Sequence, residues 1–285
     1  MANFHSPLRY PGGKNKLIEY VKALFRHNEL MDGDYVEPYA GGSSIALALA
    51  IHEYAAHVHI NDIDPSVWSF WYSVLNDTDE LCKKISDTPI NMETWIKQRE
   101  IQKNKADADT LTLGFSTFFL NRTNRSGILN AGVIGGKNQD GNFKIDARFK
   151  KEDLINRIQL IGEHRSRISL YNLDAVTLLK EVVPTLQKKT LVYLDPPYYV
   201  KGGDLYEHHY KHDDHSKVAK AAAKIKQHVM ISYDDVPEIR ELYKKYQFVS
   251  YSLSYCAQNR YRGTEAIFLG NTLECPGLKA SMQAA

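Results

Sequence analysis

The chain has 285 residues, 43% of them hydrophobic and 25% charged, so it can bury a full core as a soluble globular protein. Its 36 basic and 34 acidic residues give a net charge of +2, which excludes a globally basic protein and confines any nucleic-acid surface to a local region. The three cysteines are widely spaced and form no C-x-x-C pair, which excludes a cysteine-based zinc site and is typical of a reducing compartment.

The first part of the chain predicts one β-α-β unit. A helical pattern covers residues 14–25, and residues 34–38 then read as a short strand. From Ser44 a run of Ile, Ala and Leu predicts a helix, and residues 57–62 predict a second strand that ends in acid.

Glycines lie between the first strand and its helix, in the segment Tyr39-Ala40-Gly41-Gly42. They allow the backbone to approach a ligand closely at the start of a helix. The dinucleotide pattern G-x-G-x-x-G is absent because Ser44-Ile45 occupies the position of its third glycine, which disfavours a nicotinamide enzyme. Asp62 follows about twenty residues later at a strand end, where an acid typically binds ribose hydroxyls, so we expect a cofactor with an adenosine moiety.

The middle of the chain lacks the alternation of strands and helices. Residues 67–120 read as mostly helical, and we interpret them as an insertion. Residues 121–150 are polar and glycine-rich, which predicts a loop longer than an ordinary connector and therefore a functional one.

Alternation resumes in the second half of the chain. The predicted helices cover residues 152–164, 175–183, 216–225 and 236–246, and the predicted strands cover 168–171, 191–194, 229–232, 248–254 and 265–269. This order predicts an α/β fold with a mainly parallel sheet, whose ligands bind outside the carboxyl ends of the strands.

The most informative segment is Asp195-Pro196-Pro197-Tyr198, at the end of the apolar strand 191–194. Two prolines stop the strand and leave its carbonyls available as hydrogen-bond acceptors. Asp195 adds a charged acceptor, and Tyr198 adds a flat face on which a planar ring could stack. Such a tip suits a planar aromatic amine, and adenine fits that description.

Taken together and in order, these segments resemble the Dam-type DNA adenine-N6 methyltransferases, the alpha group of the amino-methyltransferases. The segments that carry the resemblance are Leu8-Arg9-Tyr10-Pro11-Gly12-Gly13-Lys14, Glu37-Pro38-Tyr39-Ala40-Gly41-Gly42, Asn61-Asp62-Ile63-Asp64, Phe119-Leu120-Asn121-Arg122 and Asp195-Pro196-Pro197-Tyr198. The resemblance implies a Rossmann-like methyltransferase fold in which residues 1–66 and 166–272 bind S-adenosylmethionine. Residues 67–165 would form an inserted, mostly helical DNA target-recognition domain, and residues 273–285 would form a flexible tail.

The resemblance also implies roles for individual residues. Asp195, Pro196, Pro197 and Tyr198 would form the catalytic tetrapeptide. The implied S-adenosylmethionine contacts are Tyr10, Lys14, Glu37, Tyr39, Ala40, Gly41, Gly42, Asp62, Asp174 and Asp195.

The implied reaction is methyl transfer to the N6 amine of an adenine flipped out of duplex DNA. Hydrogen bonds from the amine to Asp195 and to the Pro196 carbonyl would weaken its conjugation with the ring. Asp195 need not be a strong base, because the proton leaves only after the nitrogen has gained the methyl group. Cytosine-C5 methylation is disfavoured, because none of the three cysteines follows a proline.

DNA recognition would fall to the insertion and to the polar loop. The candidate DNA-binding residues are Asn121, Arg122, Asn124, Arg125, Asn130, Lys137, Arg148 and Arg260. Methylases of GATC sites have an aromatic residue near the position of Arg125 and a guanine-reading arginine where this chain has Asn130. Because asparagine pairs better with adenine, we expect a target other than GATC.

Several of these residues also have structural interpretations. Asp64 is expected to cap the helix that begins at Pro65, and for Asp174 a helix cap and a cofactor contact are equally favoured. His208 and His212 have helical spacing, but their surroundings offer no clean ligand set, so we expect no metal and interpret this segment as a loop over the substrate.

The sequence leaves two other classes of function open. One is methylation of an RNA base or a protein amide, and the other is a catalytically silent DNA-binding module. Since no apolar segment resembles a signal peptide or is long enough to span a bilayer, we expect a cytoplasmic protein without a membrane partner. Whether a cognate restriction nuclease accompanies the protein is open.

Overall fold

The computed structural model describes residues 5–9, 14–200, 210–256, 260–270 and 273–276. Its centre is a seven-stranded sheet with the order β3-β2-β1-β4-β5-β7-β6. The strands are β1 (Gly33–Glu37), β2 (Ala55–Asn61), β3 (Ile168–Tyr171), β4 (Leu191–Leu194), β5 (His228–Asp234), β6 (Gln247–Cys256) and β7 (Arg260–Leu269). The pairs from β3 to β5 are parallel, whereas β7 runs antiparallel to β5 and to β6. The α/β fold with a mainly parallel sheet is therefore confirmed.

Two apolar layers cover the two faces of this sheet. Because side chains alternate along a strand, Leu191 and Tyr193 of β4 join one buried cluster while Val192 and Leu194 join the other. The first cluster includes residues of α1 (Ile18–His27) and α2 (Ser44–Ile51), and the second includes residues of α8 (Ala175–Glu181), α10 (His212–Ala222) and α11 (Pro237–Leu242). The short η1 (Asn15–Leu17) leads into α1, and η5 (Val183–Thr185) follows α8.

Helix α2 is packed all round rather than on one face. Every residue from Ile45 to Ala50 is buried, and the segment contains no polar side chain that would need a partner. The helix is therefore a rigid support directly behind the glycine-rich segment that precedes it.

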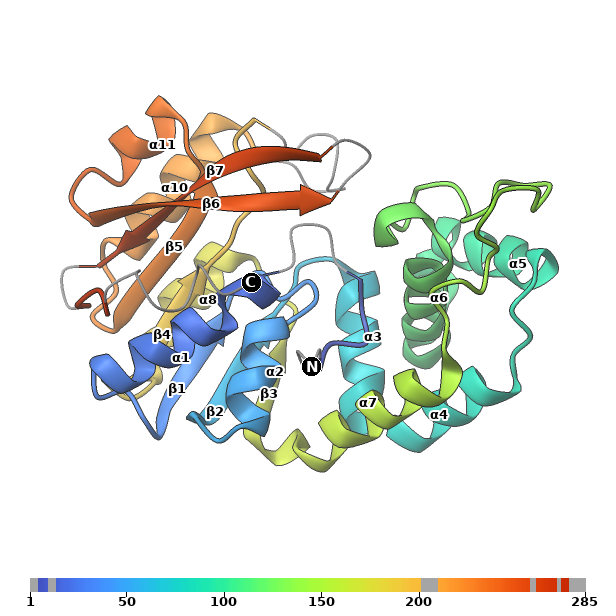
Figure 1. The fold of residues 1–285 in the computed structure, drawn as a ribbon. Coiled ribbons are helices and arrows are strands. Elements are labelled where there is room, and N and C mark those ends of the chain that lie inside the picture. Colours follow the sequence, from blue (N-terminus) through green and yellow to red (C-terminus); the bar gives the residue numbers. More distant parts are fainter. Residues whose placement is uncertain (1–4, 10–13, 201–209, 257–259, 271–272, 277–285) are drawn as a thin grey trace.

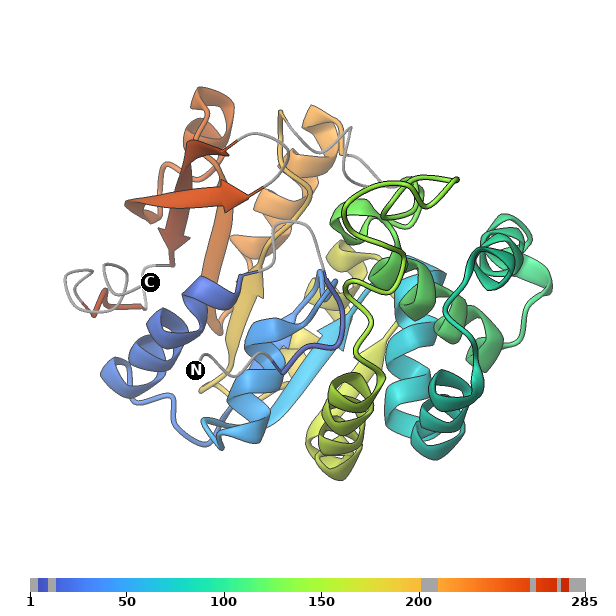
Figure 2. The ribbon, with the colours of Figure 1, turned by 45° about the vertical axis from the view of Figure 1, so that its right-hand side comes forward.

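The insertion forms the second lobe of the molecule (Figures 1 and 2). Its elements are α3 (Pro65–Asn76), α4 (Thr78–Asp87), α5 (Met92–Lys103), η2 (Lys105–Asp107), α6 (Thr110–Thr123) and η3 (Arg125–Gly127), with α7 (Lys151–Glu163) and η4 (Arg165–Arg167) leading back to the sheet. One continuous buried cluster runs from the sheet through α3 into α6 and α7. Phe70 of α3 stacks on Phe118 of α6 with ring centroids 5.8 Å apart. The two lobes therefore share a core.

Some segment boundaries differ from the sequence-based predictions. Asn121 and Arg122 belong to the last turn of α6, not to the loop that follows it. Residues 273–276, predicted as the start of a flexible tail, are packed against α1: Leu273 is buried, and the backbone N–H and C=O of Glu274 both bond to the Asn28 side chain. In the described part of the chain, no helix is long and apolar enough to cross a membrane.

Candidate functional site

The sequence motifs meet around one cavity of about 470 Å³ at the carboxyl ends of the parallel strands. Its lining includes residues from each predicted part of the site, namely Lys14, Glu37, Tyr39, Ala40, Gly41, Gly42, Asp62, Asn121, Asn130, Asp174, Asp195 and Pro197. The sheet edge therefore brings together residues that are widely separated in the sequence, as expected for a parallel α/β sheet.

The glycine-rich segment is held against Asp62. Gly41 and Ser43 have positive φ angles of 44° and 46°, so the chain turns sharply between β1 and α2. The Gly41 N–H donates to Asp62 Oδ2 at 2.9 Å, and the Asp64 N–H donates to Asp62 Oδ1 at 3.0 Å. Burial raises the pKa of Asp62 to about 7, with a smaller contribution from the Asp64 charge, whereas the bond from Gly41 opposes the shift. A carboxylate has about four acceptor positions, so Asp62 can also accept from a ligand's hydroxyls.

Glu37 lies at the end of β1 and is buried under α2. Its Oε1 accepts from the Tyr35 hydroxyl at 3.0 Å and from the Ala46 N–H, in the first turn of α2, at 3.1 Å. Burial raises the pKa of Glu37 to about 8 despite these two donors. Both acids on the glycine-rich side of the cavity therefore change charge near neutral pH.

Asp64, predicted as a helix cap, and Asp174, for which a cap and a cofactor contact were equally favoured, both cap helices. Asp64 accepts from the Ser66 N–H at 2.8 Å at the start of α3, so its predicted cap is confirmed. Asp174 accepts from the N–H groups of Val176 and Thr177 at the start of α8, at 2.9 and 3.3 Å. Because Asp174 also lines the cavity, capping does not prevent it from contacting a ligand.

Asp195 follows β4 and is contacted by Lys14 and Ser232. Lys14 Nζ lies 3.2 Å from Asp195 Oδ1, and the Ser232 hydroxyl donates to the same oxygen at 2.6 Å. Ser232 in turn lies 2.7 Å from the Tyr193 hydroxyl. Sequence reasoning missed Ser232 and Tyr193, because Ser232 becomes a neighbour of Asp195 only through the parallel register in which Leu194 faces Ile231. The signal available in the sequence was a serine next to the end of an apolar strand.

Tyr198 packs against Lys14 and does not line the cavity. The Lys14 ammonium donates to the Tyr198 hydroxyl and lies 4.8 Å from the centroid of its ring. The backbone after it is held by Asp234, whose carboxylate accepts from the N–H groups of Tyr199 and Val200 at 2.9 Å each. Among the four catalytic candidates, Asp195 and Pro197 are the two whose atoms border the cavity.

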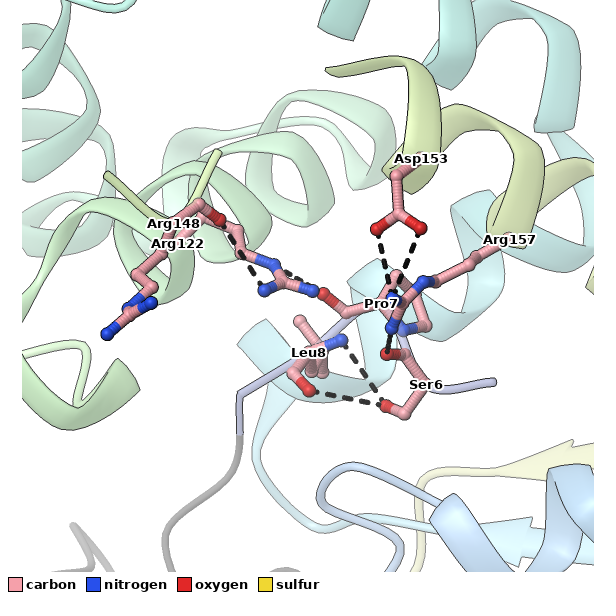
Figure 3. A network of polar contacts seen from close by, with 7 residues as sticks. All are labelled: Ser6, Pro7, Leu8, Arg122, Arg148, Asp153 and Arg157. Atoms are coloured by element: carbon pink, nitrogen blue, oxygen red, sulfur yellow. Dashed lines mark hydrogen bonds and ion pairs between the residues drawn. The ribbon is translucent and has the colours of Figure 1, made fainter. Parts of the chain in front are cut away.

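Asn121 binds the backbone of the N-terminal segment. Its Oδ1 accepts from the Arg9 N–H at 2.7 Å, and its Nδ2 donates to the carbonyls of Arg9 and Gly127 at 2.9 and 2.8 Å. Gly127 has a φ of 77°, and a Cβ there would lie 1.9 Å from the Arg9 carbonyl oxygen. Asn121 and Gly127 therefore clamp Arg9 between them, and the neighbouring Arg122 donates through Nε to the Pro7 carbonyl at 2.7 Å (Figure 3).

Asn124, predicted to bind DNA, is completely buried, with 0% of its surface exposed. Its Oδ1 accepts from Trp95 Nε1 at 2.7 Å, and its Nδ2 donates to the carbonyls of Ile128 and Leu129 at 3.1 and 2.8 Å. The side-chain amide of Asn124 is therefore bonded to groups inside the protein. Ile128 and Leu129, whose carbonyls accept from it, line the cavity. The structure thus places Asn124 beneath Ile128 and Leu129, away from the surface.

The other candidates for DNA recognition differ in exposure. Arg125, Asn130, Lys137 and Arg148 are exposed, whereas Arg122 is half-buried. Asn130 also lines the cavity. The side chain of Arg260 lies outside what the structure describes, as do Tyr10 and His208. Among the described residues, no group of three or more His, Cys, Asp and Glu side chains could hold a metal ion.

Comparison with known proteins identifies the family. The model of the D12 class of N6 adenine-specific DNA methyltransferases matches residues 10–255. No curated protein matches the chain. A crystal structure of protein LPL1258 from Legionella pneumophila is similar over 95% of this chain and 86% of that one, with 12% identity and a TM-score of 0.31. Since the family model spans most of the chain, including both strand-end motifs around the cavity, this protein belongs to the D12 class of N6 adenine-specific DNA methyltransferases.

Proposed function

We propose that this enzyme transfers the methyl group of S-adenosylmethionine to the N6 amine of an adenine flipped out of duplex DNA. The observation that carries the proposal is that Asp195 and Asp62 border the same cavity. An adenosyl ligand held at Asp62 and an adenine held at Asp195 would therefore be neighbours, as in-line transfer requires.

The residues on the Asp62 side fit S-adenosylmethionine. Asp62 offers a buried carboxylate for ribose hydroxyls, and the sharp turn at Gly41 leaves the backbone without a side chain at the point of approach. Lys14, Glu37 and Asp174 add ionisable groups to the same lining. When bound, S-adenosylmethionine supplies a methyl group that is electrophilic because it is attached to a sulfonium.

Asp195 would orient the target amine. The contacts from Lys14 and Ser232 both reach Oδ1, so they fix the plane of the carboxylate before substrate arrives. A carboxylate held in this way can accept a hydrogen bond from the adenine NH2 and stabilise the positive charge that develops on nitrogen during transfer. The Pro196 carbonyl is the second acceptor that we propose for the same amine.

Flipping the adenine costs a few kcal/mol, which contacts in the cavity must offset. We propose that Tyr198 stacks on the flipped base while the Lys14 ammonium stays at its hydroxyl and at Asp195. Pro197 already borders the space in which the base would lie.

Target selection would depend on the loop after α6. Ile128, Leu129 and Asn130 line the cavity, and Asn130 combines an exposed amide with that position. Because an amide pairs well with the edge of an adenine, we propose that Asn130 reads a base next to the target and that the site is not GATC. Arg125, Lys137 and Arg148 are exposed on the same segment and would contact phosphates or guanine edges.

The test is transfer of labelled methyl from S-adenosylmethionine to duplex DNA by the purified full chain. We expect incorporation at adenine N6, and we expect Asp195→Ala to abolish it while Lys188→Ala leaves it unchanged. Lys188 is a suitable control because it is exposed and precedes β4, at the opposite end of the strand from Asp195. Sequencing of modified adenines in DNA from expressing cells would also give the target site.

The same assay separates the other functions that the sequence leaves open. Transfer to RNA or to a protein amide, with none to DNA, would contradict the proposal. Binding to duplex DNA without any transfer would instead indicate a silent DNA-binding module.

A further inference from the structure

Strand β5 continues beyond the point at which its neighbour β4 ends. The last residue pair between the two strands is Leu194 with Ile231, and β5 then runs on to Asp234 with β7 on its other side. Pro196 and Pro197, which follow β4, have no N–H and offer β5 no backbone donor. The side chains of β5 therefore have a larger part in fixing the catalytic segment.

Two side chains of β5 contact the segment Asp195 to Tyr198 at its two ends. Residues two apart on a strand share a face, so Ser232 and Asp234 point the same way. Ser232 donates to Asp195, the first residue of the segment, at 2.6 Å. Asp234 accepts from the two N–H groups directly after the last residue, those of Tyr199 and Val200, at 2.9 Å each. Strand β5 thus brackets the four catalytic candidates.

The contact made by Asp234 is bidentate and buried. Its Oδ1 accepts from Tyr199 and its Oδ2 from Val200, so each N–H has an acceptor of its own. Asp234 is 8% exposed, which leaves water little access to these bonds. Hydrogen bonds to an ionised acceptor are the stronger class. Asparagine has the same shape with a single acceptor oxygen, so this arrangement needs the carboxylate.

The ring of Tyr199 is held by a different element, α10. Its centroid lies 5.1 Å from that of His215, and its hydroxyl lies 3.2 Å from His212 Nδ1. His215 is completely buried, and its Nδ1 lies 2.9 Å from the Tyr233 hydroxyl of β5. The backbone of Tyr199 is therefore fixed by Asp234 while its ring is turned toward α10.

Tyr198 and Tyr199 are chemically identical neighbours, so their side chains alone do not decide which ring serves the substrate. The structure separates them by direction, since Tyr198 faces Lys14 and Tyr199 faces His215. A slip of the chain by one residue would exchange the two rings, as it does in a strand. The bonds from Asp234 are made to particular backbone groups, so they oppose that slip.

We propose that Asp234 is a positioning residue that fixes Tyr198, rather than Tyr199, as the ring that stacks on the target adenine. The inference rests on the proposed function, which supplies the adenine. Asp234 does not border the large cavity, so it acts through the backbone after Tyr198 and not on the substrate. A ring that is oriented before substrate arrives lowers the cost of ordering it on binding.

The first test is steady-state methyl transfer by the full chain carrying Asp234→Asn. Because one of two bonds to a charged acceptor is lost, we expect kcat to fall about tenfold with the KM for S-adenosylmethionine unchanged. Asp235→Asn is the matched control, since that neighbouring carboxylate is 11% exposed and pairs with Arg240 instead. The control should keep its kcat. An unchanged kcat in Asp234→Asn, or a KM that rises as much as kcat falls, would overturn the proposal.

A double-mutant cycle identifies the ring through which Asp234 acts. In a Tyr198→Ala background, Asp234→Asn should lower kcat by less than about twofold, because both changes affect the same contact. In a Tyr199→Ala background, which keeps the backbone N–H, the loss should remain about tenfold. A full tenfold loss in the Tyr198→Ala background would contradict the proposal.

Amide hydrogen exchange tests the anchor itself and stays informative if a variant loses all activity. The N–H groups of Tyr199 and Val200 should be protected in the unmodified protein and in Asp235→Asn, and they should exchange at least about tenfold faster in Asp234→Asn. Equal exchange in the three proteins would overturn the proposal. The measurement needs neither DNA nor S-adenosylmethionine. It is therefore independent of the proposed function, which fails if the unmodified protein transfers no methyl to DNA.

Discussion

Lys14 and Asp195 form a partly buried ion pair in which Nζ lies 3.2 Å from Oδ1. The lysine precedes α1 and the aspartate follows β4, so this contact joins two segments that are far apart in the sequence. The Lys14 side chain is 6% exposed and the Asp195 side chain 24% exposed, so water screens the pair from the aspartate side.

Replacing Lys14 by Met keeps the apolar stem and removes the charge. We expect kcat for methyl transfer to fall about 10- to 100-fold, because breaking a partly buried pair leaves Asp195 without its cation and costs on the order of 2 kcal/mol. Steady-state kinetics give kcat, and calorimetry gives the Kd of S-adenosylmethionine. A rise in that Kd alone would assign Lys14 to the cofactor, and an unchanged kcat would contradict its role at Asp195. Lys14→Arg is the control that retains the charge.

Ser232 is expected to act as a positioning residue for Asp195. Ser232→Ala removes a 2.6 Å bond to the carboxylate. Since hydrogen bonds to charged groups contribute about 1.5 to 3 kcal/mol, we expect kcat to fall roughly 10- to 100-fold. The KM values for DNA and cofactor should stay constant, and Ser232→Thr should restore part of the rate. Tyr193→Phe removes a hydroxyl that contacts Ser232 rather than Asp195, so its effect on kcat should be smaller. If Ser232→Ala raised KM as much as it lowered kcat, Ser232 would have a structural role instead.

Cofactor affinity is expected to rise with pH through neutrality. The pKa of Asp62 is raised to about 7 by burial, so this group is mostly protonated at pH 6 and mostly ionised at pH 8. Ribose hydroxyls donate better to the ionised form, so the Kd of S-adenosylmethionine should fall by up to about tenfold between these pH values. Calorimetry in two buffers of different ionisation enthalpy should also detect proton release below pH 7. Asp62→Asn should bind weakly and lose most of this dependence, and an affinity that falls with pH would refute the assignment.

Gly127→Ala is expected to destabilise the protein by about 3 kcal/mol in urea unfolding. The residue has a φ of 77°, and its new Cβ would meet the Arg9 carbonyl, so the bonds from Asn121 to Arg9 would be disturbed. Gly136→Ala provides the matched control, because Gly136 has a φ of 78° with its nearest neighbour 3.7 Å from the Cβ position. The control should cost about 1 kcal/mol, the strain of the backbone alone. Equal losses in the two variants would show that the clamp on Arg9 contributes little.

Much of the fold and part of the site were predictable from the sequence. Strands β3 and β4 begin and end at the predicted residues, because polar residues on both sides of a short run limit where the strand can begin and end. Asp62 and Asp195 lie at the cavity as expected, because parallel strands collect their carboxyl ends at one edge. Ser232 was not predictable, since its contact with Asp195 depends on the pairing of β4 with β5.

The asparagines show a different limit. Asn121 and Asn124 looked like DNA contacts because amides suit base edges, but their partners lie inside the protein and are backbone groups and, for Asn124, also the Trp95 indole. An amide near the end of α6 can point toward bound DNA or toward backbone carbonyls inside the protein. The polar sequence around it does not specify which direction it takes. The burial of Leu273 was likewise not predicted, because the residues around it have a mixed composition with no periodic pattern.

The position of α3 sets a rule for exchanging the insertion between related enzymes. A chimera that replaces residues 67–165 would cut into α3 and into the buried cluster that it shares with the sheet. Trp71 of α3 also donates through Nε1 to the Gly41 carbonyl at 2.9 Å, so a foreign α3 would alter the turn beside Asp62. An exchange that begins after Asn76 keeps this helix with its own glycine turn, and we expect it to fold where the incoming α6 supplies an aromatic residue at the position of Phe118, which stacks on Phe70.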